Sequence, residues 1–204
     1  MNQSISPEIL QTLPPIGGMD DSPRGRVLRA AAYLFHEQGY ARTTVRELAL
    51  MVGIQSGSLF HHFKSKDAIL CAIMEEAIIY NLQQMHNAIE QGATPAERLK
   101  GLIRAELESI NGNTSHAMAV LVYEWNAITT QQQEPLLAMR EEYESLWLKV
   151  LDDLKLEGKI KHDTFICRRL LSGATFGTAL WYKPNGRISI AELAEVTLAM
   201  ALRG

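Results

Sequence analysis

The sequence predicts an all-α protein in which a group of short N-terminal helices precedes a larger helical domain. Three observations support this fold class. Apolar residues recur at helical spacing from about residue 22 onward, and capping residues, glycines and prolines mark where helices begin and end. No segment alternates between apolar and polar residues for long enough to indicate a strand.

The composition limits the class of protein. The chain has 204 residues and is 47% hydrophobic, which is enough for a packed core. It has no apolar run of about 18 residues, so no membrane partner is expected, and its N-terminus does not resemble a signal peptide. Cys71 and Cys167 lie far apart without metal-ligand spacing. We therefore expect two buried thiols and a reducing, cytoplasmic location.

Proline, glycine and capping residues divide the chain into three parts. Residues 1–21 contain three prolines and two glycines without helical periodicity, which predicts a flexible arm. Residues 22–81 are predicted to form a small domain of short helices, with its central motif at about 44–63. Residues 82–204 are predicted to form the larger helical domain.

Helix starts are specific in the small domain. Ser22 followed by Pro23 predicts a first helix that ends at Gly39. Thr44 and Glu47 form a predicted capping box that opens a second helix. After Gly53 we expect a third helix over about 56–63, and a fourth begins after residue 65. Further starts are predicted at Thr94, Ser115, Glu134–Pro135, Asp163 and Ser189.

Charge is distributed unevenly along the chain. Between residues 22 and 66 there are seven Lys and Arg residues and two acidic residues, so this segment carries +5. The whole chain carries −3, and the remainder therefore carries −8. A basic block on an acidic body is typical of a small DNA-binding domain.

The short helices have the lengths of a helix-turn-helix motif. Small Ala49 allows a close crossing of the second and third helices, and Gly53 allows a backbone angle that other residues resist. If Ile54, Leu59 and Phe63 fill the core, the intervening polar residues face outward. These residues, which suit contacts with bases and phosphates, are Gln55, Ser56, Ser58, His61 and Lys64.

The residues G-Y-A-R-T-T-V-R-E-L-A (39–49) and G-I-Q-S-G-S-L-F-H-H-F-K-S-K-D (53–67) resemble the signature of the TetR family of transcriptional regulators. The resemblance covers about residues 22–81. It implies a homodimeric repressor that binds double-stranded operator DNA and releases it when a small effector binds. It also implies that Thr44, Ser58, His61 and Lys66 contact phosphates, while Arg46, Gln55 and Ser56 lie nearest the bases. Phe60 replaces the family's frequent tyrosine, and Gln55 replaces its usual serine.

Neither a catalytic site nor a resident cofactor is expected. The sequence lacks a nucleophile elbow, a phosphate loop and a dinucleotide fingerprint. His61 and His62 are adjacent, so on a helix they point about 100° apart and do not favour a shared metal. His116 is a single histidine in its region, and Glu106 and Glu108 fit a solvated helix face. A second hypothesis is a helical ligand-binding or adaptor protein that has lost DNA binding.

The larger domain is rich in methionine and aromatic residues, which suit either a packed core or an apolar effector cavity. We predict that Tyr123, Trp125, Trp147 and Phe176 line the cavity, with Trp125 in the middle of a helix. The segment W-Y-K-P-N-G-R-I-S (181–189) resembles one found in TetR members that respond to acyl-CoA thioesters. For such an effector the candidate phosphate partners are Arg168, Arg169, Lys183 and Arg187.

Small and apolar residues recur at spacings of three and four in the last two predicted helices. This pattern fits either the core side of one monomer or a dimer interface in a four-helix bundle. The predicted interface residues are Leu170, Ala174, Gly177, Leu193, Val196, Thr197 and Met200.

Overall fold

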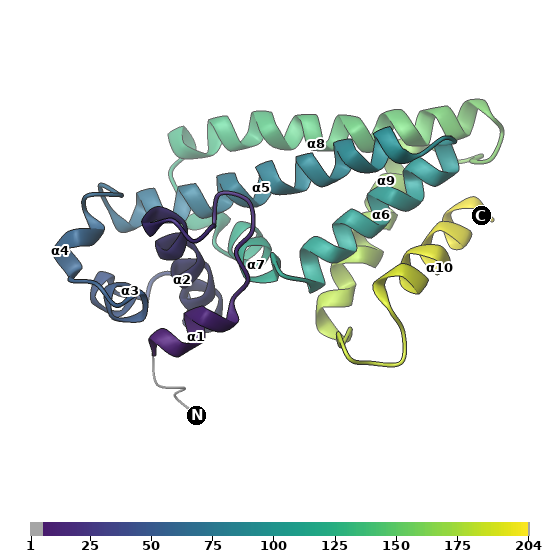
Figure 1. The fold of residues 1–204 in the computed structure, drawn as a ribbon. Helices are drawn as coiled ribbons and strands as arrows, with labels where there is room; N and C mark the ends of the chain where they lie inside the picture. Colours follow the sequence, from purple (N-terminus) through teal and green to yellow (C-terminus); the bar gives the residue numbers. More distant parts are fainter. Residues whose placement is uncertain (1–5, 204) are drawn as a thin grey trace. The chain divides into compact units, whose positions relative to one another are not determined.

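A computed structural model describes residues 6–203, which form helices joined by short connections (Figure 1). The helices are α1 Pro7–Thr12, α2 Pro23–Gln38, α3 Val45–Val52, α4 Ser56–Leu59, α5 Lys66–Gln91, α6 Pro95–Asn111, α7 Ser115–Tyr123, η1 Trp125–Ala127, α8 Thr130–Leu156, α9 Thr164–Gly177, η2 Thr178–Leu180 and α10 Ile190–Leu202. Within these residues the one extended pairing is an isolated bridge between Ile16 and Met19. The expected all-α class is confirmed.

The described chain forms two compact units. The first unit comprises residues 6–80 and 116–136, and the second comprises 81–115 and 137–203. The first break falls close to the predicted boundary after residue 81. The segment 116–136 packs with the first unit, whereas the sequence analysis placed it in the C-terminal domain.

Capping residues determine where the helices of the first unit begin. The Ser22 side chain accepts a hydrogen bond from Gly25 N, with Pro23 as the first residue of α2. Both bonds of the predicted capping box between Thr44 and Glu47 are present at the start of α3. Gly53 ends α3 in the left-handed region at φ +77°, which glycine adopts without the steric cost of a side chain. These three predictions are confirmed.

The expected flexible arm is folded over the part that the structure describes. Ser6 caps α1, and Leu10 and Met19 are buried. α1 contacts α2 and α3, and Gly18 N donates to the Glu76 carboxylate at 3.2 Å. The structure of residues 6–21 thus differs from the extended arm that the sequence indicated, because two buried apolar residues and the Gly18–Glu76 bond dock this segment. Residues 1–5 lie outside the described residues.

Two helix boundaries differ from the prediction. α4 ends at Leu59, and the chain continues in turns with bonds from His61 N to Ser58 O and from His62 N to Leu59 O. The tighter i to i+3 pattern follows a segment rich in serine and glycine, which are weak helix formers. α8 begins at Thr130 instead of Pro135, because Thr129 and Gln132 form an N-terminal cap with reciprocal bonds.

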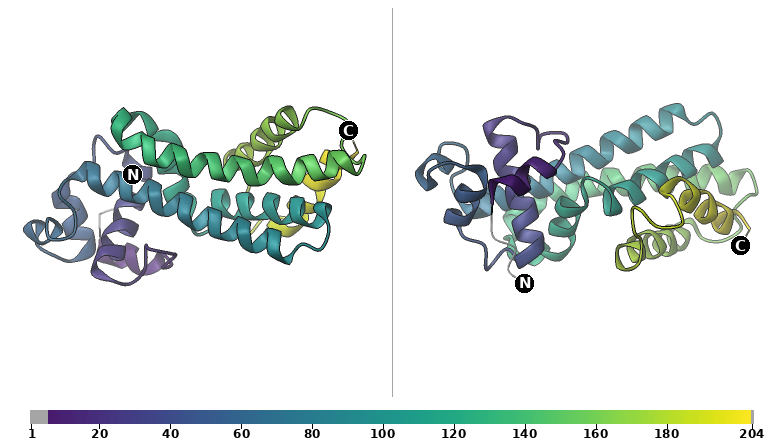
Figure 2. Two further views of the ribbon diagram at one scale, coloured as in Figure 1. Left: turned by 90° about the horizontal axis from the view of Figure 1, so that it is seen from above. Right: turned by 60° about the horizontal axis from the view of Figure 1, so that its bottom comes forward.

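The core of the second unit surrounds α6. This helix contacts α9, η2 and α10, and Figure 1 shows α10 lying alongside it. Residues from α6, α8, α9 and α10 form one buried apolar cluster that includes Leu102, Trp147, Leu171 and Leu193. The later part of α5 lies beside α8 (Figure 2), where His86 and Glu142 approach to 3.1 Å. Among the described helices, none combines the length and apolarity needed to cross a membrane.

Candidate DNA-binding surface and effector domain

The predicted DNA-binding residues gather on α3, α4 and the turns that follow them. Arg46 is exposed on the first turn of α3, and Gln55 is exposed immediately before α4. Ala49 and Leu59 are buried beneath them, as the sequence predicted. The remaining predicted contacts are exposed or half-buried and follow Gln55 along the chain: Ser56, Ser58, Phe60, His61 and Lys64. Whether each contacts DNA stays a prediction.

Lys66 has a different environment from the other predicted phosphate contacts. Its ammonium group is half-buried and donates to Tyr40 O at 2.8 Å and to Thr43 O at 2.9 Å. It also lies 4.2 Å from the centroid of the Tyr40 ring. Two of its three N–H donors therefore hold the turn that presents Thr44. The sequence could not distinguish this role from a phosphate contact, because both require a cation at the same position.

Several of the basic residues counted in the sequence form ion pairs or hydrogen bonds within the chain. Arg29 is buried and pairs with Asp21 at 2.6 Å, and Arg24 pairs with Glu76 at 3.1 Å. Arg26 donates to Val52 O at the end of α3. Lys66 is engaged as well, and Arg42 Nε donates to Gln38 O. Arg24, Arg26 and Arg42 are still exposed, but within residues 6–203 Arg46 and Lys64 are the exposed basic residues of this segment without a hydrogen-bond or ion-pair partner. The unpaired positive charge is thus smaller than the sequence charge indicated, and it lies near the turn.

The Thr44 hydroxyl is committed to its own helix. It accepts a bond from Glu47 N at 3.2 Å and donates to Glu47 Oε2 at 2.7 Å. The Glu47 carboxylate accepts bonds from the Thr44 hydroxyl and from Thr44 N, and these two bonds lower its pKa below the usual value. Thr44 therefore fixes the start of α3, and a phosphate contact there stays a prediction.

The four predicted effector residues fall into both units. Trp147 is completely buried in the core of the second unit, and Phe176 is half-buried on α9 of the same unit. Tyr123 and Trp125 belong to the first unit. Trp125 begins the short helix η1 and is not in the middle of a helix, because α7 ends at Tyr123. Their roles as ligand contacts stay predictions.

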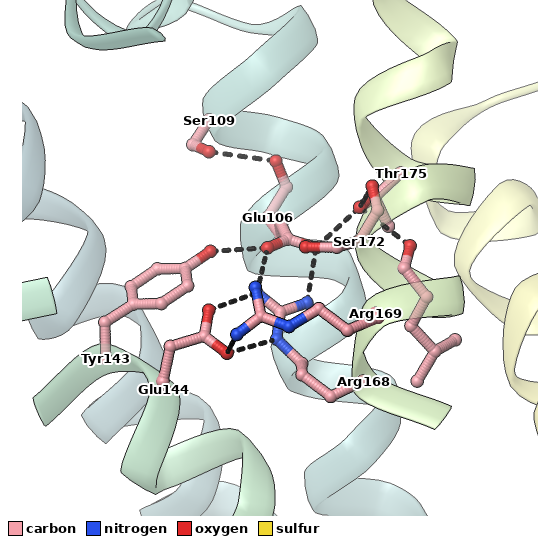
Figure 3. Close-up of polar contacts among 9 residues, drawn as sticks. Glu106, Ser109, Tyr143, Glu144, Arg168, Arg169, Ser172 and Thr175 are labelled. Atoms are coloured by element: carbon pink, nitrogen blue, oxygen red, sulfur yellow. Dashed lines mark hydrogen bonds and ion pairs between the residues drawn. The ribbon is translucent and has the colours of Figure 1, made fainter. Parts of the chain in front are cut away.

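A buried polar cluster, which we call the Glu106 cluster, lies in the second unit (Figure 3). The Glu106 carboxylate is fully buried and accepts from Arg168 Nη2 at 2.9 Å. It also accepts from the Tyr143 hydroxyl at 2.5 Å and from the Thr175 hydroxyl at 2.6 Å. The Glu144 carboxylate accepts from Arg168 at 3.2 Å. Three helices, α6, α8 and α9, are thereby joined by charge-assisted bonds.

The Glu106 cluster corrects two expectations. Glu106 is not on a solvated helix face, and Arg168 is not free at a pocket mouth, because each compensates the buried charge of the other. Burial alone would lower the pKa of Arg168, but the adjacent Glu106 raises it, so the guanidinium stays charged. Burial and Glu106 also raise the pKa of the Tyr143 hydroxyl, which remains a donor. No sequence spacing links residues 106, 143 and 168.

The Trp147 side chain adjoins this cluster. The Arg168 guanidinium carbon lies 4.1 Å from the centroid of the indole ring. Within residues 6–203 the buried indole Nε1 has no hydrogen-bond acceptor. A buried donor without an acceptor is unusual in a folded protein and marks a place where a ligand or water acceptor would be favourable.

A cavity of about 520 Å³ lies in the second unit among α5, α6 and α10. Its lining is mixed, with Lys100, Arg104 and Glu195 beside small residues such as Gly101 and Ala194. Lys100 and Glu195 form an ion pair at 2.8 Å within it. None of the four predicted effector residues lines this cavity.

The last two long helices expose apolar side chains. Leu170 on α9 is 70% exposed and Met200 on α10 is 72% exposed. Val196 and Ala174 are also exposed, whereas Thr197 and Gly177 are half-buried and Leu193 is buried. Most of the predicted interface set therefore lies on the surface instead of in the core of its own chain, an arrangement that favours the dimer hypothesis. The assignment stays a prediction.

Two parts of the chain match known protein families, and these matches define the class of protein. Residues 27–73 match the family described as bacterial regulatory proteins, tetR family, and residues 92–204 match the tetracyclin repressor-like C-terminal domain. The protein is thus a helix-turn-helix regulator by class. The chain belongs to the TetR family, as the sequence signature implied.

Individual relatives are similar to this chain over nearly its whole length. The HTH-type transcriptional repressor KstR2 of Mycobacterium tuberculosis (strain H37Rv) is 30% identical over 93% of this chain and 96% of its own. The structure described as ketosteroid transcriptional regulator KstR2 has a TM-score of 0.80 at 28% identity, covering 93% and 97% of the two chains. A structure described as superantigen PfiT is 50% identical with a TM-score of 0.78, covering 90% and 98%.

Proposed function

We propose that this protein is a cytoplasmic transcriptional repressor that binds operator DNA as a homodimer and releases it when an apolar or amphipathic effector binds. The observation that carries the proposal is the surface around α4. There Arg46 on the capped helix α3, Gln55 immediately before α4 and Lys64 after α4 are exposed over a buried apolar support. Polar side chains on a rigid support are what base readout requires.

DNA binding can be tested with fluorescence anisotropy on DNA from upstream of the gene. We expect Gln55→Ala to reduce affinity for the preferred site by about 1–3 kcal/mol and to relax specificity at one base pair, because a glutamine amide pairs bidentately with adenine. Gln131→Ala is the matched control, since Gln131 is an exposed glutamine on α8. Equal weakening on every DNA sequence would exclude base reading by Gln55.

The second hypothesis, an adaptor that has lost DNA binding, is disfavoured. The features that would favour it are Phe60, in place of the family's frequent tyrosine, and the acidic net charge. Phe60 is 54% exposed and leaves the start of α3 intact, while the acidic charge lies outside the basic segment. The adaptor hypothesis predicts no sequence-dependent binding to any upstream fragment, so the same anisotropy experiment tests it.

The effector is proposed to bind in the C-terminal domain and to shift the protein between two conformations of different operator affinity. Trp147 Nε1 has no acceptor within residues 6–203 and lies beside an aromatic and aliphatic core, which supports Trp147 as a ligand contact. The segment 181–189 favours an acyl-CoA thioester. Long-chain acyl-CoA should then release the operator, whereas free CoA and free fatty acid should release it poorly. Equal release by all three would exclude joint recognition of head group and tail.

A further inference from the structure

We propose that His36, Glu37 and His116 form a binding site for one divalent transition-metal ion of the zinc class. The three side chains come from the last turn of α2 and the first turn of α7, both in the first unit. Their candidate ligand atoms all lie within 4.8 Å of one another. This site shares no residue with the predicted DNA-binding or effector-binding sets, although Tyr123 of the effector set lines the adjoining cavity.

The distances are close to those of a bound ion. His36 Nδ1 already lies 3.2 Å from Glu37 Oε1, and the two imidazole centroids are 5.1 Å apart. Ligand atoms bound to tetrahedral zinc at about 2.1 Å lie about 3.4 Å from one another. The widest pair must therefore approach by no more than about 1.4 Å, which small side-chain rotations can supply. Two imidazoles and one carboxylate are a ligand set that zinc accepts, with one position left for solvent.

Adjacency in the chain disfavours a shared metal at His61 and His62 but not at this site. His36 and Glu37 are also adjacent on a helix, but the longer glutamate side chain reaches back to its neighbour. His116 is 79 residues beyond Glu37 in the chain, so no local motif reveals it. The fold brings it to α2, where the edge of its ring also packs on Tyr33 at 5.3 Å.

The surroundings of His36 and Glu37 favour a cation. His36 and Glu37 line a cavity of about 360 Å³ together with Gly39, Tyr123 and Glu124. They lie at the C-terminal end of α2, where the helix dipole is negative. Arg42 is the one cation lining this cavity, and its Nε is bonded to Gln38 O. A bound ion would join α7 directly to α2 and so stabilise the first unit.

The test measures Zn²⁺ binding to the full-length, tag-free protein by isothermal titration calorimetry after treatment with EDTA. We expect one ion per chain, with affinity at least tenfold lower for His36→Ala and for His116→Phe. Phenylalanine keeps a ring against Tyr33, so loss of packing is separated from loss of the ligand. His86→Ala is the matched control, because His86 and Glu142 form a similar half-exposed pair in the second unit, with no third ligand among residues 6–203.

Two further measurements give independent readouts. Zn²⁺ should raise the melting temperature of the wild type and of His86→Ala, but not that of His116→Phe. Co²⁺ bound to the wild type should give the visible absorption of nitrogen and oxygen ligands. His36→Ala and His116→Phe should each lose this absorption. Binding that is unchanged in His36→Ala and His116→Phe, or equally reduced in His86→Ala, would overturn the proposal. Operator binding by EDTA-treated protein is measured separately, so failure of this site and failure of repressor function are distinguishable.

Discussion

Replacing Lys66 with methionine tests whether this lysine supports the turn or contacts DNA. Methionine keeps the unbranched apolar stem but removes the ammonium group. The turn then loses two charge-assisted bonds, to Tyr40 O and Thr43 O, and a cation–π contact with the Tyr40 ring. Such bonds contribute about 1.5–3 kcal/mol each when well shielded. Because the ammonium is half-buried, we expect a total loss of about 2–4 kcal/mol.

Lys64→Met is the matched control for this substitution. Lys64 is exposed, and within residues 6–203 it has no hydrogen-bond or ion-pair partner, so its replacement should change stability by less than about 0.5 kcal/mol. Stability is measured by urea-induced unfolding at one fixed protein concentration, because dissociation of a dimer depends on concentration.

The salt dependence of operator binding should change in Lys64→Met and not in Lys66→Met, which is the opposite of the expected order for stability. If Lys64 neutralises one phosphate, Lys64→Met should reduce the slope of log affinity against log salt by about 0.9. Lys66→Met should leave this slope unchanged, even though it weakens binding through the turn. A Lys66→Met protein of unchanged stability and reduced salt slope would refute the reasoning and restore Lys66 as a phosphate ligand.

Three further predictions concern the rest of the chain. Leu170→Asp and Met200→Asp should yield folded monomers in sedimentation, because each places a charge on the exposed apolar face. The same change at exposed Leu156 should leave the dimer intact. A stable wild-type monomer would exclude the dimer hypothesis. Arg168→Met should destabilise the protein by about 3–5 kcal/mol in urea, since Glu106 would remain buried without its cation, and exposed Arg169→Met should not. Thr44→Ala should reduce the free energy of unfolding by about 1 kcal/mol, because the cap of α3 is lost. The part of the stability that depends on Glu47 ionisation should be present above the unfolded pKa of this carboxyl and disappear as the pH falls through its lowered folded pKa. An unchanged acid-unfolding profile in Thr44→Ala would contradict this linkage.

Local chemistry made the helix boundaries predictable where both partners are close in sequence. Ser22 with Gly25, Thr44 with Glu47 and the left-handed Gly53 are examples. The start of α8 was missed because proline was given more weight than the Thr129 and Gln132 cap, although that signal was present. The fold class and the family could therefore be predicted, and the DNA-binding surface could be located.

Long-range pairing could not be predicted from the same chain. Glu106 and Arg168 are 62 residues apart, and either could belong to a solvated face until the fold is known. His36 and His116 likewise meet through packing of α2 and α7. Charge counting also overestimated the cationic surface, because pairing partners such as Asp21 and Glu76 lay outside the segment that was counted.

The Glu106 cluster limits which cations the effector domain can offer to an anionic ligand. Arg168 binds Glu106 and Glu144 and cannot leave without exposing a buried carboxylate to an apolar environment. Lys183 and Arg187 are exposed beside the half-buried Tyr182 and are the better candidates for acyl-CoA phosphates. In operator-release titrations the Lys183→Glu and Arg187→Glu double variant should therefore require at least tenfold more long-chain acyl-CoA than the wild type. The matched control is Lys161→Glu with Lys149→Glu, two lysines outside the segment 181–189. An equal response of both double variants would show that overall charge, and not a phosphate site, governs release.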